Sequence, residues 1–316
     1  MAKYRTALPT LGEGIFVSYT GIETDLIFNR GIDLPGFASY PLLESEDGRE
    51  MLHGYYAQLI GMARLNGVGV LLESLTWVAN HDRGAAIGHN PASLKKFNIA
   101  AIDMIARVRE EKGDLPTLLS AQVGPRSDGY APRERMTADE AEIYHGEQME
   151  TISQTEADLV SACTLCYPEE AIGIVRAGKR FDMPVAIAFT VETDGRLPIG
   201  MPLREGIETV DDATDGGAAY FMINCAHPDH FSGVLEDEPW VQRLRGVVTN
   251  ASRCSHAELD ESEELDDGDP EELGELVGAI SKKFPHFTIV GGCCGTDMRH
   301  LRRIVEQVKM KDQKKL

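Results

Sequence analysis

Eight short apolar segments recur along the chain at a nearly even spacing, and this repeat limits the folds that the chain can adopt. From Tyr19, at the end of the first segment, to Gly291, at the end of the last, seven intervals cover 272 residues, or about 39 each. Such a spacing suits a repeated strand–loop–helix–loop unit. The segments are mostly continuous apolar runs, which are typical of parallel strands covered on both faces. The predicted strands are Ile15–Tyr19, Val68–Glu73, Thr117–Gln122, Asp158–Cys163, Val185–Val191, Tyr220–Cys225, Val247–Asn250 and Phe287–Gly291.

Eight units of this kind predict an α/β chain folded as a closed (β/α)8 barrel of the TIM type rather than an open sheet. Such a barrel takes roughly 250 residues in one domain, and no segment between the units has the composition of a linker. We therefore expect a single domain over residues 1–316. The helix signals between the strands are an apolar stripe (Leu94, Phe97, Ala101, Ile105, Val108), a capping box at Thr137–Glu140, and Pro168 at a first helical position.

One segment differs in composition from the rest of the chain. Residues 258–272 contain ten acidic residues out of fifteen, and such a density of like charges favours a mobile, solvated loop. The segment falls in the seventh βα loop, at the end of the barrel where active sites of this fold lie. We interpret it as a solvated surface loop, with a lid over the site as the alternative.

Charge and hydropathy limit the partners of the chain. With 31 basic and 51 acidic residues its formal net charge is −20, which argues against binding nucleic acid through a broad basic face. The apolar runs are far shorter than the roughly 20 residues of a membrane span, and the first ten residues lack the apolar core of a signal peptide. We expect a cytoplasmic protein that binds small molecules, with no nucleic-acid or membrane partner and an oligomeric state left open.

The strongest chemical signal is the pair Cys293–Cys294 in the segment GGCCGT, directly after the last predicted strand. Adjacent cysteines do not form an ordinary disulfide with each other, whereas a sharp glycine turn allows both sulfurs to face one point. A second motif, NCAHP, places Cys225 at the end of the sixth strand. In a barrel both segments open onto the same rim. Buried cysteines acting as small hydrophobic residues are the structural alternative.

Three thiolates on rigid strand ends would supply three sulfur ligands for Zn²⁺. The fourth tetrahedral position would then be left to water or substrate, as in catalytic zinc sites. A purely structural zinc site would need a fourth protein ligand, for which His227 or Cys163 are the candidates. His227 lies two residues after Cys225, and we interpret it as shaping the loop.

With these motifs the chain resembles the zinc-dependent homocysteine S-methyltransferase family, a group of (β/α)8 barrels that includes betaine–homocysteine methyltransferase and the homocysteine module of methionine synthase. The resemblance covers essentially the whole chain. It implies that Cys225, Cys293 and Cys294 bind zinc. The segments that carry it are GGCCGT, NCAHP, Val123–Tyr130 (VGPRSDGY), Phe189–Pro198 (FTVETDGRLP) and Asn250 after the seventh strand.

The resemblance also implies a reaction. A methyl group would move from a sulfonium or quaternary ammonium donor to a zinc-activated thiol, with homocysteine as the default acceptor and methionine as the product. Zinc chemistry agrees, because a thiol bound to the cation loses its proton and can attack the methyl group without a separate base. We therefore expect no catalytic group beyond the zinc-activated thiol. A noncatalytic zinc-dependent protein that binds a small thiol or onium compound is the alternative from another class.

Two positions depart from the family pattern. The family ends its first strand with an aspartate–glycine–glycine turn, and here Tyr19 takes the position of the aspartate. Cys163 takes the position of a glutamate at the end of the fourth strand. The family uses these two carboxylates to hold the amino group of homocysteine, and in a dry site their loss would leave the ammonium without a charged partner.

Two explanations compete for these departures. Glu73, at the end of the second strand, could supply a replacement carboxylate. Alternatively, the acceptor is a different thiol with no α-amino group in that place, or the enzyme demethylates an onium metabolite and the thiol is only the methyl sink. Cys163 itself is either a small neutral residue on the rim or a further thiolate near the metal.

The other candidate substrate residues are loop positions next to strand ends. Trp77 follows the second strand and would either wall the donor pocket or pack in an ordinary way. Glu192, just past the fifth strand, would face a cationic donor or be solvated. The full set of predicted substrate contacts is Tyr19, Gly21, Glu73, Trp77, Cys163, Glu192 and Asn250.

Overall fold

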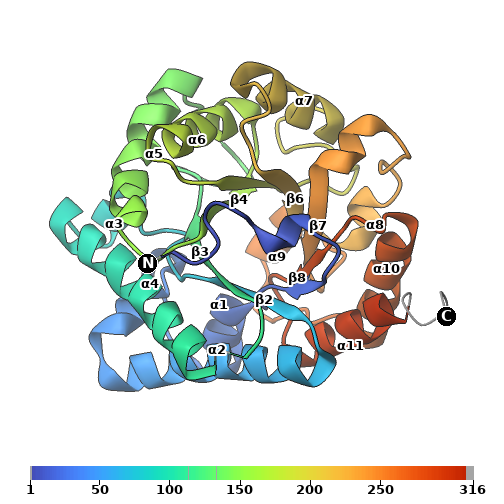
Figure 1. The fold of residues 1–316 in the computed structure, drawn as a ribbon, viewed down its shortest axis with the longest axis horizontal. Helices are drawn as coiled ribbons and strands as arrows, with labels where there is room; N and C mark the ends of the chain where they lie inside the picture. The colour runs from blue at the N-terminus through green and yellow to red at the C-terminus, as the bar shows by residue number, and fades with distance from the viewer. Residues whose placement is uncertain (1, 113, 133, 311–316) are drawn as a thin grey trace.

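The computed structural model describes residues 2–112, 114–132 and 134–310, and in it eight parallel strands form a closed barrel. Each strand pairs with the next one in the chain, and β8 pairs with β1. Figure 1 shows the helices arranged as a ring around these strands. The strands are β1 (Phe16–Val17), β2 (Gly69–Glu73), β3 (Thr117–Val123), β4 (Leu159–Leu165), β5 (Val185–Phe189), β6 (Tyr220–Asn224), β7 (Leu244–Thr249) and β8 (Ile289–Gly292).

A helix follows each strand, although the helix after β6 is only one turn long. The helices are α1 (Ile22–Thr24), α2 (Glu46–Asn66), α3 (His81–Ala86), α4 (Pro91–Lys112), α5 (Ala138–Ser153), α6 (Pro168–Arg180), α7 (Leu203–Thr214), α8 (Pro228–Phe231), α9 (His256–Asp260), α10 (Pro270–Lys283) and α11 (Met298–Lys309). Shorter 3₁₀ turns cover Pro9–Leu11, Pro35–Phe37, Tyr40–Glu44 and Pro239–Arg243, and a π turn covers Asp25–Asn29.

The predicted (β/α)8 barrel in a single domain is confirmed, and each of the eight predicted segments overlaps one strand. Residues 1, 113, 133 and 311–316 of the predicted domain lie outside the described residues. The first strand is shorter than expected because its pairing with β2 ends at Val17. Beyond Val17 the chain is hydrogen-bonded to β8 only, where the Gly292 N–H donates to the Tyr19 carbonyl (2.9 Å). The seventh strand begins earlier than expected, at Leu244. Gly246 interrupts the apolar run in the sequence, which hid this start, but in the structure Gly246 pairs with β6.

The helix signals are also confirmed. All five residues of the apolar stripe on α4 are buried against the barrel. The Thr137 side chain accepts a hydrogen bond from the Glu140 N–H, and the Glu140 carboxylate accepts one from the Thr137 N–H (2.8 Å), which completes the capping box before α5. Pro168 is the first residue of α6.

The apolar core has two parts, one on each side of the strands. The larger part lies between the strands and the surrounding helices. The smaller part fills the inside of the barrel with residues such as Phe16, Leu71, Leu118, Tyr220 and Ile289. The barrel is therefore packed through its centre and leaves room for ligands only at its ends.

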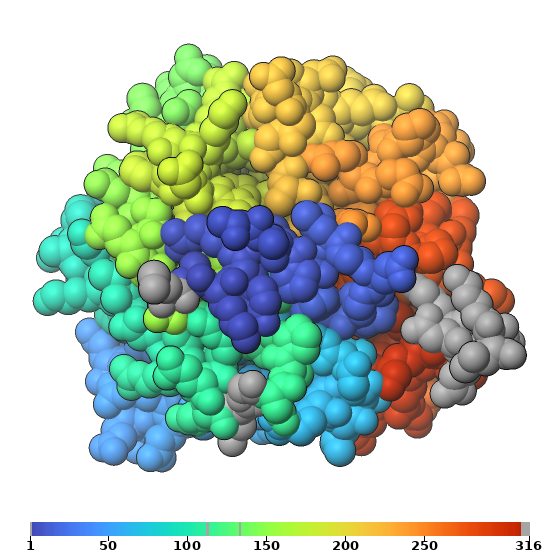
Figure 2. Space-filling model, viewed as in Figure 1, coloured from blue at the N-terminus to red at the C-terminus, as the bar shows by residue number. Residues whose placement is uncertain are grey.

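The N-terminal segment closes the end of the barrel where the strands begin. The Asp158 carboxylate, just before β4, accepts hydrogen bonds from the Lys3 N–H (2.7 Å) and the Tyr4 N–H (2.6 Å). The Arg5 guanidinium donates to the Ala157 carbonyl (2.8 Å). Figure 2 shows this segment, in dark blue, spread across the middle of that face. The opposite end, where the strands finish, is the one that remains for a functional site.

No helix in the described part of the chain is long and apolar enough to cross a membrane.

Candidate metal centre and substrate site

Three cysteine sulfurs meet at the carboxyl end of the barrel. Cys225 directly follows β6, and Cys293 and Cys294 directly follow β8. Their Sγ atoms all lie within 4.8 Å of one another, and those of Cys225 and Cys294 are 3.8 Å apart. Sulfur ligands about 2.3 Å from a tetrahedral zinc ion would lie about 3.8 Å from each other, so this spacing fits such a site. Among the described residues, this is the one group of three or more cysteine, histidine or acidic side chains placed to hold a metal.

Within the same described residues, no fourth protein ligand joins the three sulfurs. His227 is engaged elsewhere, since its Nδ1 accepts a hydrogen bond from the Asp229 N–H (3.2 Å) and caps α8. Cys163 is buried and packs inside the barrel. Neither candidate for a structural zinc site therefore completes the tetrahedron, and Cys225 and Cys294 line an adjoining cavity.

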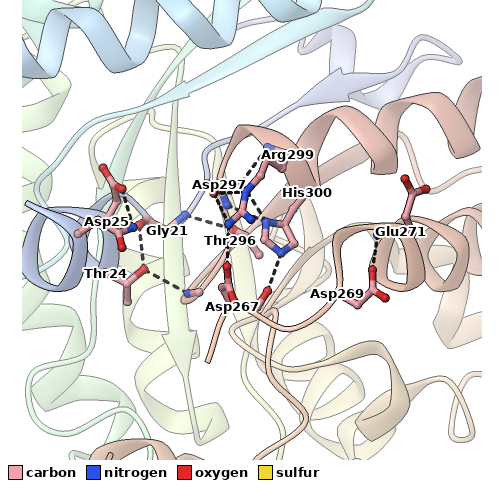
Figure 3. A network of polar contacts seen from close by, with 12 residues as sticks. Gly21, Thr24, Asp25, Asp267, Asp269, Glu271, Thr296, Asp297, Arg299 and His300 are labelled. Carbon is pink, nitrogen blue, oxygen red and sulfur yellow. Dashed lines mark hydrogen bonds and ion pairs between the residues drawn. The ribbon is translucent and has the colours of Figure 1, made fainter. Parts of the chain in front are cut away.

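The loop after β1 holds the cysteine pair in place. The Gly21 N–H donates to the Thr296 carbonyl (3.0 Å), and the Gly295 N–H donates to the Thr24 hydroxyl (3.1 Å). A Cβ atom on Gly21 would lie 2.5 Å from the Cys293 carbonyl oxygen, so a larger residue would displace the turn. Figure 3 shows these contacts joining the two loops. Gly21, a predicted substrate contact, thus packs directly against the cysteine turn.

The same network reaches the acidic segment 258–272. The Asp267 carboxylate pairs with Arg299 (2.7 Å), and the Asp267 carbonyl oxygen lies 2.8 Å from Nε2 of His300 (Figure 3). Leu259, at the start of the segment, and Leu265, in its middle, both line the cavity next to the sulfurs. The segment therefore borders the site, and its opening and closing as a lid stay a prediction.

Several side chains surround Cys225, whose backbone adopts the left-handed conformation (φ 55°). The Tyr130 hydroxyl lies 2.9 Å from the Cys225 Sγ. The Cys225 carbonyl accepts a hydrogen bond from the Asn250 side chain (3.2 Å) and lies 2.7 Å from Nε2 of His256. Nδ1 of His256 lies 3.2 Å from the Glu192 carboxylate. Of the predicted residues, Asn250 contacts Cys225 directly and Glu192 reaches it through His256. Sequence reasoning missed His256. It also gave no role to Tyr130, although this residue ends the VGPRSDGY motif.

The three thiols have very different acidities. Hydrogen bonds from Cys293 and Cys294 hold the pKa of the Cys225 thiol well below its ordinary value. The pKa values of Cys293 and Cys294 are raised, chiefly by their hydrogen bonds with Cys225. One thiolate therefore forms readily, and its charge opposes ionisation of the other two unless a cation is present. This donor set fits a divalent metal of the zinc type.

Two adjoining cavities lie next to the sulfurs. The larger, which we call the outer chamber, has a volume of about 660 Å³ and opens beneath the acidic segment. The smaller, which we call the inner chamber, has a volume of about 50 Å³ and is lined by all three cysteines. Trp77 lines both chambers, donates from Nε1 to the Cys163 carbonyl (3.1 Å), and meets Phe37 edge-on with ring centroids 6.2 Å apart. Trp77 therefore combines the two roles considered for it, as a cavity wall and as a packing residue.

Tyr19 and Glu73 border one small cavity, but Tyr19 alone of the two reaches the chambers beside the sulfurs. Tyr19 lines the inner chamber, and burial raises the pKa of its hydroxyl well above the ordinary value. Glu73 lines neither chamber; it borders a much smaller cavity together with Tyr19 and Tyr56. Burial raises the pKa of the Glu73 carboxyl to about 7, and neither of its oxygens has a hydrogen-bond partner among the described residues. Its role as a replacement carboxylate stays a prediction.

Sequence reasoning missed Glu23, a carboxylate that lines the inner chamber beside the cysteines. Its Oε1 accepts a hydrogen bond from the Ser39 hydroxyl (2.7 Å), and burial raises the pKa of the carboxyl. Among the described residues, no lysine or arginine lines this chamber. A carboxylate without a basic partner favours a cationic group on the ligand. The available signal was the position of Glu23, four residues after Tyr19 in the same turn.

Comparisons with known proteins agree with the fold. The sequence model of the homocysteine S-methyltransferase family matches residues 66–308. The oxidized form of the homocysteine methyltransferase MmuM from Escherichia coli is similar in structure, with 16% sequence identity and a TM-score of 0.71 over 97% of this chain and 100% of that chain. Its metallated form gives 16% identity and a TM-score of 0.69 over 96% of this chain and 99% of that chain. A comparison with curated proteins found no match.

Proposed function

Because the chain belongs to the homocysteine S-methyltransferase family, we propose that it is a zinc-dependent thiol S-methyltransferase. A methyl group would move from a sulfonium or quaternary ammonium donor to the sulfur of a thiol. The bond from the methyl carbon to the onium sulfur or nitrogen breaks, the new carbon–sulfur bond forms, and the thiol proton leaves to solvent. With homocysteine as the acceptor, the product is methionine.

The observation that carries this proposal is the group of three sulfurs within 4.8 Å of one another on the wall of a cavity. Cys225, Cys293 and Cys294 would hold the zinc ion. When bound, zinc would lower the pKa of the acceptor thiol into the physiological range and so supply the nucleophile. Three protein ligands and an open fourth position are the donor set of a catalytic zinc site.

The side chains around the sulfurs would orient the reactants. Tyr130 would donate a hydrogen bond to the Cys225 sulfur, and Asn250 and His256 would hold the Cys225 carbonyl, which keeps the ligand atoms in place. The aromatic rings of Phe37 and Trp77 wall the outer chamber and suit a cationic onium group. The walls of both chambers would exclude water from the attacking sulfur.

Two kinds of thiol acceptor are compatible with the site. Glu23 supports an acceptor with an ammonium group, such as homocysteine, because it places a carboxylate beside the sulfurs. Methylation of a different thiol, or demethylation of an onium metabolite, is the second candidate. The observation that favours this alternative is the presence of Tyr19 and Cys163 where the family carries carboxylates.

The zinc requirement can be tested with two matched cysteine variants. Cys293→Ser removes a proposed ligand, whereas Cys254→Ser removes an exposed cysteine that is not part of the cluster. We expect reduced wild-type protein and Cys254→Ser to bind one zinc ion per chain and to transfer methyl groups. Cys293→Ser should lose both properties together. Full methyl transfer by zinc-free protein would contradict the proposed mechanism.

The acceptor can be tested by calorimetric titration of the zinc-loaded protein with L-homocysteine in buffers of different ionisation enthalpy. Binding with release of a proton would show that the thiol ionises at the metal. Failure of homocysteine to bind, with another thiol binding and releasing a proton, would favour the second candidate. Tight binding of thiols and onium compounds with no turnover would indicate a noncatalytic binding protein.

A further inference from the structure

We infer that Glu170 is a positioning residue for the metal centre. Together with its buried partner His145, it holds the loop that presents Tyr130 to the Cys225 sulfur. The inference rests on the proposed function in one respect, namely that Cys225 is a ligand of the metal. It adds two residues that line neither of the two chambers and that no motif in the sequence singled out.

Glu170 and His145 form a polar pair in the interior of the protein. Glu170 lies in the first turn of α6 and His145 in the middle of α5, and their side chains are 1% and 0% exposed. Nε2 of His145 lies 2.9 Å from Oε1 of Glu170. Nδ1 of His145 and Oε2 of Glu170 have no hydrogen-bond partner among the described residues. Taking such groups out of water costs free energy, and a pair with two unpaired atoms regains little of it. Stability alone therefore does not account for the pair.

The same carboxylate oxygen reaches the loop after β3. Oε1 of Glu170 accepts a hydrogen bond from the Arg126 N–H (2.8 Å). A hydrogen bond from a backbone N–H to a carboxylate is roughly twice as strong as one between neutral groups. The Arg126 side chain also pairs with Asp82, but these two side chains are 41% and 38% exposed, and an exposed ion pair contributes little. Of these two contacts, the one with Glu170 fixes the backbone of the loop.

A short, internally bonded turn connects Arg126 to the metal centre. The Asp128 carboxylate accepts hydrogen bonds from the Tyr130 N–H (2.8 Å) and the Ala131 N–H (3.1 Å). At the end of this turn the Tyr130 hydroxyl lies 2.9 Å from the Cys225 Sγ. Because the turn is held by its own hydrogen bonds, a shift of Arg126 would move the Tyr130 hydroxyl relative to the sulfur.

The turn also meets the barrel closely. A Cβ atom on Gly129 would lie 2.9 Å from the Thr164 side chain, near the end of β4. The turn is therefore pressed against β4 and tethered to α6 by Glu170. Groups that hydrogen-bond to metal ligands typically contribute 10- to 100-fold to metal affinity, so the tether should be measurable as zinc affinity.

The test is a double-mutant cycle on zinc affinity, which needs no turnover. Competition with a chelator measures the zinc affinities of Glu170→Ala, Tyr130→Phe and the double variant. We expect Glu170→Ala to weaken zinc binding about tenfold, at the lower end of the range for such groups. The double variant should bind zinc as weakly as Tyr130→Phe alone, to within about twofold, because Glu170 acts through the Tyr130 hydroxyl.

Matched variants separate this role from a general loss of structure. Glu170→Gln keeps an oxygen that can accept from the Arg126 N–H, so it should recover most of the zinc affinity lost in Glu170→Ala. Glu169→Ala removes a carboxylate from the same turn of α6, one whose Oε2 has no hydrogen-bond partner among the described residues. It should leave zinc affinity unchanged. Thermal unfolding checks that each variant is folded. If Glu170→Ala does not fold, Glu170→Asp, which keeps the charge but shortens the side chain, takes its place in the cycle.

Hydrogen exchange in the zinc-free proteins tests the tether without the metal. We expect the backbone N–H groups of residues 126–131 to exchange at least about tenfold faster in Glu170→Ala than in wild-type protein, because a stabilising hydrogen bond is lost. Their exchange in Glu170→Gln and Glu169→Ala should stay close to that of wild-type protein.

Three outcomes would overturn the inference. These are unchanged zinc affinity in Glu170→Ala, fold-losses of Glu170→Ala and Tyr130→Phe that multiply in the double variant, and unchanged hydrogen exchange of residues 126–131 in Glu170→Ala. Multiplying losses would mean that Glu170 acts on the metal centre by a route other than Tyr130. Failure of the proposed function looks different, because wild-type protein would then bind no zinc and transfer no methyl group, while exchange in the loop would still depend on Glu170.

Discussion

The two ends of the barrel differ in how fully their buried charged groups are hydrogen-bonded. At the closed end, the buried Asp158 carboxylate accepts four hydrogen bonds, from the N–H groups of Lys3, Tyr4 and Leu119 and from the guanidinium of Arg109. Nothing in this arrangement is left for a ligand. The polar groups around Asp158 satisfy one another and so stabilise the fold.

At the open end, two charged side chains have buried atoms that lack such partners among the described residues. Both carboxylate oxygens of Glu73 and Nη1 of Arg83 have no hydrogen bond. Cys225, at the same end, has a left-handed backbone conformation, and this conformation costs free energy in a residue with a side chain. These unpaired groups and the strained Cys225 lie where a bound ligand could compensate for their cost. The comparison predicts that substitutions around Asp158 change stability alone, whereas those around the cysteines change binding.

The largest expected effect is at the closed end. Asp158→Asn would replace a fully buried carboxylate with an amide and leave the Arg109 guanidinium without its buried partner. We expect a loss of about 3–5 kcal/mol in the free energy of unfolding, as for other broken buried ion pairs. Urea denaturation measures this loss, and the zinc content per folded chain should not change. As the control, Asp139→Asn removes an exposed pair with Arg176 and should cost less than about 1 kcal/mol. Equal effects of the two substitutions would contradict the contrast between the ends.

The second prediction concerns Glu73, whose buried carboxyl has a pKa of about 7 against an ordinary value of 4.5. The native state therefore keeps a proton that the unfolded chain releases between these two values. The stabilising contribution is fully present below about pH 4.5 and is lost as the pH rises through about 7. At 1.36 kcal/mol per pKa unit, the loss is about 3 kcal/mol.

Glu73→Gln should remove this dependence, because glutamine does not titrate. We expect the variant to lose less stability than wild-type protein between pH 5 and pH 8, by about 3 kcal/mol. Urea denaturation of both proteins at the two pH values measures the difference. Parallel pH profiles would show that the carboxylate finds a partner inside the barrel.

The barrel itself could be predicted from the sequence, and the site only in part. Continuous apolar runs mark parallel strands because both faces of each strand are buried, and the eight runs gave the eight strands with small errors at their ends. The cysteine pair was visible because GGCCGT combines unusual residues with a glycine turn at a strand end. These signals are local in the chain, so one sequence is enough to read them.

Glu23, Glu73 and Arg83 show why the rest could not be predicted. Whether a carboxylate reaches the chamber depends on register and on loop conformation, which are set by contacts distant in the sequence. Glu73 pairs in register with Ser120 of β3, inside the barrel, whereas Glu23 reaches the inner chamber from the short helix α1. Arg83 stands out only because its buried Nη1 has no acceptor among the described residues, and this information is absent from the sequence.

The third prediction concerns Tyr130, which connects the open end to the proposed metal. Tyr130→Phe removes the hydroxyl 2.9 Å from the Cys225 sulfur but keeps the ring that packs on His256. Groups that hydrogen-bond to metal ligands typically contribute 10- to 100-fold to metal affinity, and we expect a loss in that range with little change in stability. Competition with a chelator measures the zinc affinity. Tyr144→Phe, which removes a hydroxyl bonded to Asn80, is the control and should leave zinc affinity unchanged.

The smallest expected effect tests which carboxylate meets the acceptor. Glu23→Gln should weaken the binding of L-homocysteine about tenfold, because a buried charged hydrogen bond to its ammonium is lost. Binding of 4-mercaptobutyrate, which is homocysteine without the amino group, should not change. If Glu73→Gln, and not Glu23→Gln, weakens homocysteine binding alone, the carboxylate that meets the ammonium group is Glu73, inside the barrel. The contrast between the two ends would then be smaller than their hydrogen bonds indicate. If neither variant discriminates between the two thiols, no carboxylate replaces those lost at Tyr19 and Cys163, and the acceptor is a thiol without an ammonium group at that place.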